Sequence, residues 1–167
     1  HTPLFGFMIC YDDLYNGNIS RTQWKTKNDG DLRGRYYDYT YDDLNRLNDA
    51  RYYALSRGPV SKPYGETIAY DKNGNITSLA RFGFTGLDEY AQSMYDKIDD
   101  LIYKYAPHSN QLQGVSDNGT PEGFNNGTTG TDDDYAYDLN GNMTHDLNKG
   151  IVKIDYNHLN LPESIYF

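Results

Sequence analysis

A short phrase recurs along the chain and constrains its fold more than any other feature. The phrase has a Tyr, then an Asp or Asn, two variable residues, a Gly/Asn pair and an apolar residue. Its clearest copies are YDDLNRL at Tyr41–Leu47, YDKNGNI at Tyr70–Ile76 and YDLNGNM at Tyr137–Met143. Looser copies are YNGNI at Tyr15–Ile19, YAPHSNQL at Tyr105–Leu112 and YNHLNLP at Tyr156–Pro162. Such a recurring unit, here irregularly spaced, predicts an array of similar supersecondary elements.

Each phrase predicts a β-hairpin. Asn-Gly pairs adopt positive φ at low cost and close two-residue hairpins, so Gly74 and Gly141 are expected to be turn glycines. The Tyr of each phrase should end one strand, and the apolar residue should begin the next. Alternation around one copy supports strands, because Tyr37, Tyr39 and Tyr41 would share one face. The predicted structural anchors of the repeat are Tyr41, Tyr70, Tyr105, Tyr137, Tyr156, Gly74 and Gly141.

These units predict a mainly β chain of irregular antiparallel hairpins, stacked into a curved, solenoid-like sheet. We expect residues 1–167 to form a single segment of this sheet, with a flexible loop rich in Gly, Thr, Asn and Asp at 116–134. One stretch departs from the pattern, because its apolar residues have helical spacing, and it predicts a short helix near 87–96. The predicted repeat copies lie near 15–26, 41–54, 70–83, 105–116, 137–150 and 156–167.

Composition agrees with this fold and excludes several classes of protein. The chain has 18 Tyr, 16 Gly and 16 Asn, and 20 of its 24 acidic residues are Asp. Asp, Asn and Gly disfavour helix interiors, while 15% aromatic residues argue against disorder. The net charge of −9 disfavours binding to nucleic acid, and no apolar run is long enough to span a membrane.

The phrase also resembles the YD repeat of the RHS family, most closely in YDKNGNITSLARFG and YDLNGNMTHDLNKG. The resemblance covers about residues 14–167. It implies a β-sheet ribbon that spirals into a hollow shell, which in several bacterial toxin complexes encloses a C-terminal toxin. The DP-x-G motif and self-cleaving core of fuller members have no counterpart, because the chain has no Asp-Pro pair. The expected partners are neighbouring repeats of a longer parent chain and an enclosed segment such as a toxin, in a secreted or cell-surface bacterial protein.

The residues give less support to more specific functions, such as metal binding or catalysis. Asp71 and Asp138 begin sequences that look like calcium loops, but Gly stands at the fourth position instead of the sixth and the closing Glu is missing. Zinc spacings and a G-x-S-x-G elbow do not occur. We therefore expect no enzyme, no catalytic or metal site and no cofactor. The alternative is a cell-surface adhesin that binds glycans through aromatic residues, with Trp24 as the stacking residue.

Overall fold

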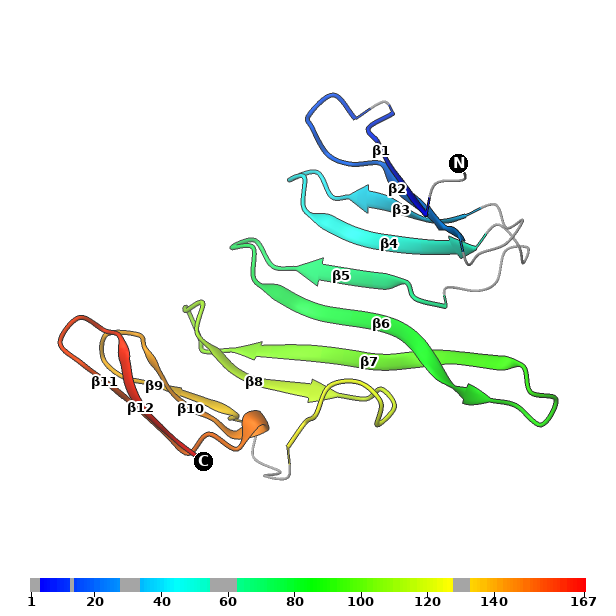
Figure 1. The fold of residues 1–167 in the computed structure, drawn as a ribbon. Helices are drawn as coiled ribbons and strands as arrows, with labels where there is room; N and C mark the ends of the chain where they lie inside the picture. The colour runs from blue at the N-terminus through cyan, green and yellow to red at the C-terminus, as the bar shows by residue number, and fades with distance from the viewer. Residues whose placement is uncertain (1–3, 13, 28–33, 55–62, 128–132) are drawn as a thin grey trace. The chain divides into compact units, whose positions relative to one another are not determined.

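The molecule is built of antiparallel β-strands, which confirms the mainly β fold expected from the phrase. A computed structural model describes residues 4–12, 14–27, 34–54, 63–127 and 133–167 (Figure 1). The strands are β1 (Phe5–Cys10), β2 (Arg21–Thr26), β3 (Arg35–Tyr41), β4 (Leu47–Ala54), β5 (Glu66–Tyr70), β6 (Ile76–Leu87), β7 (Ser93–Tyr105), β8 (Leu112–Asp117), β9 (Tyr135–Tyr137), β10 (Met143–Asp146), β11 (Lys153–Tyr156) and β12 (Pro162–Tyr166). A short 3-10 helix, η2 (Leu147–Lys149), follows β10.

The first eight strands form one sheet in chain order, from β1 to β8. The last four strands form two separate pairs, β9 with β10 and β11 with β12. Within each of the three sheets, every strand pairs with its neighbours in sequence, as is usual when consecutive strands are antiparallel. The eight-stranded sheet is open, since β1 and β8 are its two ends.

Contacts divide the chain into two compact units. One consists of His1–Ala69 and Ala80–Ile98, and the other of Tyr70–Leu79 and Asp99–Phe167. The first unit therefore holds β1 to β4, most of β5 and the facing parts of β6 and β7. The second unit holds the beginning of β6, the end of β7 and all later strands.

One face of the sheet in the first unit is aromatic. Strand register places Trp24 of β2 diagonal to Tyr37 of β3, which is paired with Tyr52 of β4. The ring centroids of Trp24 and Tyr37 lie 5.8 Å apart, and those of Tyr37 and Tyr52 lie 5.4 Å apart. Further ring contacts extend the row to Tyr64, Tyr95 and Phe84. Aromatic pairs across strands stabilise a sheet beyond the burial of their area.

The opposite face of the same unit is ionic. Arg21 of β2 forms two hydrogen bonds with the carboxylate of Asp38 on β3, at 2.5 and 3.0 Å. Arg51, in register with Asp38, donates to Asp49, which also accepts from the Thr67 hydroxyl. Alternation along the strands therefore places the row of rings on one face and these ion pairs on the other. The ionic face also carries a ring pair, because Tyr36 and Tyr53 stack there with centroids 4.7 Å apart and the Arg21 guanidinium lies over the Tyr36 ring.

Buried apolar side chains are few in the described part of the chain: Ala50, Leu101 and Val115. In the second unit, buried carboxylates hold the irregular segments in place. Asp99 accepts a hydrogen bond from the Phe124 N–H at 2.6 Å, and Asp134 accepts one from the Val115 N–H at 2.7 Å. Buried charges are tolerated when backbone donors or a counter-ion satisfy them in this way.

The helix expected near 87–96 is wrong. Residues up to Leu87 belong to β6, and β7 begins at Ser93, so the stretch is a hairpin turn (Figure 1). The carboxylate of Asp88 accepts hydrogen bonds from the N–H groups of Tyr90 and Gln92, and Ala91 has a φ of 57°. These bonds stabilise the turn against a helix. Its apolar residues mimic helical spacing because two strands meet there at a turn.

The predicted loop at 116–134 is structured at both ends. Strand β8 continues to Asp117, and Asp134 is buried against β8. Residues 128–132 lie outside the described part of the chain. In the part that the structure describes, no helix has the length and apolar character needed to cross a membrane.

Candidate functional site

The chemistry that recurs between copies of the phrase lies in its turn, and the turn at Asp71–Asn75 shows the geometry. The Asp71 N–H donates to the Asn75 carbonyl at 2.9 Å, and the Gly74 N–H donates to the Asp71 carbonyl at 3.2 Å. Gly74 has a φ of 93°. This is a three-residue loop with a left-handed residue at its end, so the expected two-residue hairpin is wrong. The expected positive φ is present at Gly74 and also at Gly141, where φ is 85°.

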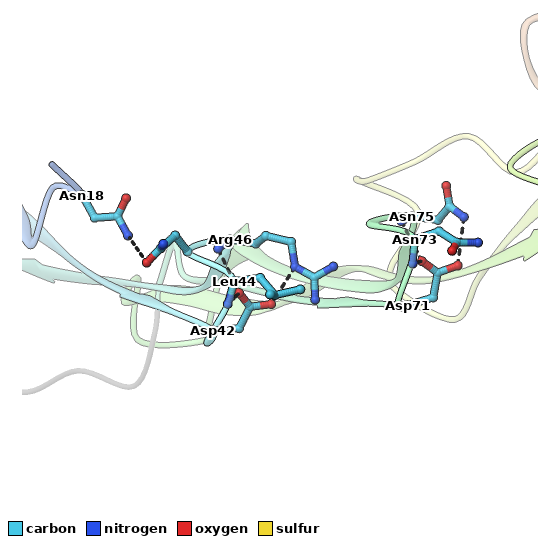
Figure 2. Close-up of polar contacts among 8 residues, drawn as sticks. Asn18, Asp42, Leu44, Arg46, Asp71, Asn73 and Asn75 are labelled. Atoms are coloured by element: carbon cyan, nitrogen blue, oxygen red, sulfur yellow. Dashed lines mark hydrogen bonds and ion pairs between the residues drawn. The ribbon is translucent and has the colours of Figure 1, made fainter. Parts of the chain in front are cut away.

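The aspartate of the phrase clamps this loop. Asp71 Oδ1 accepts from the N–H groups of Asn73 and Asn75, at 2.8 and 2.9 Å. Its Oδ2 accepts from the Asn75 side-chain amide at 2.9 Å (Figure 2). The Asn75 amide and these backbone donors hold the pKa of the Asp71 carboxyl below its usual range. Asp138 makes the same bonds with Asn140 and Asn142, and its pKa is lowered in the same way.

Other turns keep the clamp with different residues. In the turn after β3, Asp42 Oδ1 accepts from the N–H groups of Leu44 and Arg46, and the Arg46 guanidinium replaces the asparagine amide at 2.7 Å (Figure 2). In the last turn an asparagine, Asn157, accepts the two backbone hydrogen bonds. The left-handed residues of the variant turns are Asn45, Ala91, His108 and Asn160. Most of these turns therefore keep an acceptor at their first position even where glycine is replaced. The turn of His108 is the exception, because it begins at Ala106 and uses the Ser109 hydroxyl as its acceptor.

The tyrosines of the phrase link each hairpin to the preceding turn. Each of the five anchors ends a strand: β3, β5, β7, β9 or β11. The Tyr41 hydroxyl donates to the carbonyl of Ile19 at 2.8 Å, and the Tyr105 hydroxyl donates to that of Ile76 at 2.9 Å. In each case the acceptor is the apolar residue that ends an earlier copy of the phrase. We call this set of bonds the tyrosine ladder.

Two more bonds of the tyrosine ladder lie in the second unit. The Tyr137 hydroxyl donates to Leu112 at 3.0 Å, and the Tyr156 hydroxyl donates to Met143 at 2.8 Å. Burial raises the pKa of Tyr41, Tyr105 and Tyr137, so these phenols stay protonated donors well into alkaline solution. The ladder thus joins β9 to β8 and β11 to β10 by side chains, where the regular sheet does not continue.

Asparagine amides form a second link between turns, which we call the asparagine ladder. Asn45 Oδ1 accepts from the amide of Asn16 at 2.5 Å and from that of Asn18 at 3.4 Å. Figure 2 shows the contact of Asn18. In the second unit, Asn110 accepts from Asn73 and Asn75, and Asn160 accepts from Asn140 and Asn142. One amide oxygen therefore receives two donors from the preceding turn in each case.

The hydrogen bonds of the aspartate clamp occupy oxygens that a metal ion would need. Both carboxylate oxygens of Asp71 and of Asp138 already accept hydrogen bonds within their own turns. Within the described residues, no group of three or more His, Cys, Asp or Glu side chains is placed to hold a metal ion. In the acidic run at 132–134, Asp133 pairs with Lys104 at 3.1 Å and Asp134 is buried, while Asp132 lies outside the described residues.

The proposed glycan-stacking residue, Trp24, lies in the aromatic row of the first unit. Its ring stacks on that of Tyr37 with an interplanar angle of 21°, and it is tilted against Tyr52 at 6.1 Å. One ring face of Trp24 is therefore turned toward a neighbouring ring. The more exposed members of the row are Tyr64 and Phe84.

Sequence reasoning named the tyrosines and glycines but missed two of the residues that do the bonding. The aspartate clamp depends on the second and sixth positions of the phrase, Asp71 and Asn75 in the clearest copy. In that copy the asparagine ladder uses Asn75 again, together with Asn73. Their signal was present, because Asp at the second position recurs in YDDLNRL, YDKNGNI and YDLNGNM. An Asx side chain that accepts from the backbone two residues on is a general turn device.

Comparison with known proteins assigns no family to this arrangement. No protein-family model matches the chain, and no curated protein sequence matches it. The repeated turn, the tyrosine ladder and the asparagine ladder are therefore the observations from which a function has to be argued.

Proposed function

We propose that the chain is a structural module of the RHS type, whose YD-repeat hairpins form part of a shell wall. In this proposal the wall is a curved, solenoid-like sheet that encloses or presents another segment of its parent protein, such as a C-terminal toxin. The parent would be secreted by a bacterium or displayed on its surface. The module would have no catalytic role of its own.

The tyrosine ladder is the observation that carries this proposal. A hydroxyl that reaches the carbonyl of an earlier copy joins successive hairpins in the same way at four places. A link that depends only on the phrase can be repeated for any number of units, as in other repeat proteins. A wall needs this property, whereas a binding pocket needs a unique group of side chains.

The scarcity of buried apolar residues agrees with a wall. Ala50, Leu101 and Val115 are the buried apolar residues of the described chain, and many large side chains are exposed. The hydrogen bonds of turns and ladders therefore contribute much of the order in each unit. A thin sheet stabilised in this way can separate two compartments without a thick core.

Electron microscopy of the complete gene product would test the proposal. We expect a hollow particle whose wall contains these hairpins and whose interior holds density for another segment. A filled particle, or one in which these hairpins lie apart from any cavity, would contradict it.

The glycan-binding alternative makes a separate prediction. A glycan array probed with the chain should stay blank if the module is structural. Specific binding that disappears in Trp24→Ala, and persists in the matched variant Tyr90→Ala on an exposed turn, would favour the adhesin instead.

A further inference from the structure

Three turns of the chain carry an Asn-Gly pair at the same position, and one of them differs from the other two in its bonding. The pairs are Asn16-Gly17, Asn73-Gly74 and Asn140-Gly141. All three are exposed, and all three glycines have a φ between 85° and 93°. The three turns are therefore alike in solvent exposure and in glycine conformation. A difference in their reactivity would then come from their hydrogen bonds.

The glycine nitrogen is engaged in two of these turns. The Gly74 N–H donates to Asp71 O at 3.2 Å, and the Gly141 N–H donates to Asp138 O at 3.1 Å. Among the residues that the structure describes, nothing accepts a hydrogen bond from the Gly17 N–H. Leu14 stands where these turns have the clamping aspartate. A leucine side chain cannot accept the backbone N–H bonds by which Asp71 and Asp138 hold their turns in this conformation.

The side chain of Asn16 is also held differently. Its Oδ1 accepts from the Asn18 N–H at 3.1 Å, and its Nδ2 donates to Asn45 Oδ1 at 2.5 Å. A donor on Oδ1 stabilises negative charge that develops on this oxygen when a nucleophile attacks Cγ. Asn73 and Asn140 share with Asn16 the Nδ2 bond to the next turn, so the bond on Oδ1 is what distinguishes Asn16.

We propose that Asn16 is a site of spontaneous modification, which deamidates through a succinimide faster than Asn73 and Asn140. The Gly17 backbone nitrogen loses its proton to hydroxide and attacks Asn16 Cγ, while negative charge collects on Oδ1 beside the Asn18 N–H. The Cγ–Nδ2 bond then breaks, and Nδ2 takes up a proton and leaves as ammonia. Water opens the succinimide at either carbonyl and gives aspartate or isoaspartate. The net reaction consumes one water and releases one ammonia.

The modification would act on the asparagine ladder. A carboxylate at position 16 has no amide to donate to Asn45 Oδ1, and isoaspartate adds a methylene group to the backbone of the turn. The link from the first turn to the next is then lost at its shortest contact. The reaction would thus slowly weaken the asparagine ladder at its first turn.

The test follows deamidation of the folded chain at mildly alkaline pH by peptide mapping with mass spectrometry, and isoaspartate with protein isoaspartate methyltransferase. We expect Asn16 to react about fivefold faster than Asn73 and Asn140, the rate equivalent of one net hydrogen bond. In strong denaturant the three rates should converge, because each Asn precedes Gly. Equal rates in the folded chain, or an unchanged difference in denaturant, would overturn the proposal.

Two variants exchange the feature that distinguishes the turns. Leu14→Asp supplies the missing aspartate and should slow Asn16, whereas Asp71→Leu removes it and should speed up Asn73. The untouched turn at Asn140 is the internal control in both proteins. If Asn16 keeps its rate in Leu14→Asp and Asn73 keeps its rate in a folded Asp71→Leu, the clamp does not control the reaction and the proposal fails.

Discussion

At the scale of single residues, several turns of the fold share one acceptor at the second position of the phrase. Asp71 and Asp138 use both carboxylate oxygens, whereas Asn157 makes the two backbone bonds without a charge. The chain therefore contains its own comparison between a charged and a neutral clamp. Hydrogen bonds to a charged acceptor are the stronger of the two.

Asp71→Asn should lower the free energy of unfolding at neutral pH, and it should make this free energy vary less as the pH falls. The pKa of Asp71 is depressed from its ordinary value of 3.8, so its contribution is present above that value and lost as the pH falls through the folded-state pKa. The variant and the wild type should therefore differ in urea midpoint at pH 7 and converge in acid. A difference that stays constant with pH would show that charge plays no part in the clamp.

Tyr105→Phe tests the tyrosine ladder. The change removes the donor to Ile76 O and should cost about 1 kcal/mol of unfolding free energy, measured by urea denaturation. Tyr90→Phe is the matched control, because Tyr90 is 73% exposed and lies outside the ladder. Equal effects of the two changes would contradict a structural role for the hydroxyl.

At the scale of strands and turns, the sequence predicted some elements and missed others for physical reasons. The prediction that the Tyr of each phrase ends a strand is correct for the five anchors, such as Tyr41 and Tyr137. It is wrong for the shortened copy at Tyr15, which lies in a turn after β1 has ended at Cys10. The turn at Asp88–Gln92 has Leu87 in the Tyr position and Ala91 in the Gly position, so only its aspartate remained as a signal. The two ladders join residues far apart in sequence, and no local pattern reveals such contacts.

The long hairpin of β6 and β7 depends on a close approach between strands. A Cβ added at Gly83 would lie 2.6 Å from Ile98 Cδ1 and 3.2 Å from Ile98 Cγ2. Gly83→Ala should therefore cost about 1–3 kcal/mol of stability, the usual cost of overpacking.

A smaller partner should restore the space. The double variant Gly83→Ala with Ile98→Val is expected to recover part of the loss in a double-mutant cycle of urea midpoints. Gly6→Ala is the control, because nothing lies within 4 Å of a Cβ at Gly6. Additive effects at Gly83 and Ile98 would show that the close approach does not limit packing.

At the scale of the whole molecule, the open sheet ends in an edge strand, one side of which pairs with no described strand. Among the strands that the structure describes, β1 is the first of the sheet and pairs only with β2. Its side chains Phe5, Phe7, Met8 and Ile9 are all exposed, and the strand carries no charge or proline. Charged residues and proline are the usual protection of an edge strand against pairing with another chain.

The chain should therefore self-associate through β1. We expect the mass from light scattering to rise with protein concentration, and Phe7→Lys to reduce this rise by placing a charge on the edge strand. Leu159→Lys, which replaces an exposed apolar residue in the last turn, should leave the association unchanged. A monomer at every concentration would contradict the prediction, and an equal effect of the two lysines would assign the effect to net charge. If Phe7→Lys suppresses the association and Leu159→Lys does not, the exposed edge of β1 is the site of self-association. The position of β1 at the end of the sheet would then determine the contact between copies more than the acidic surface does.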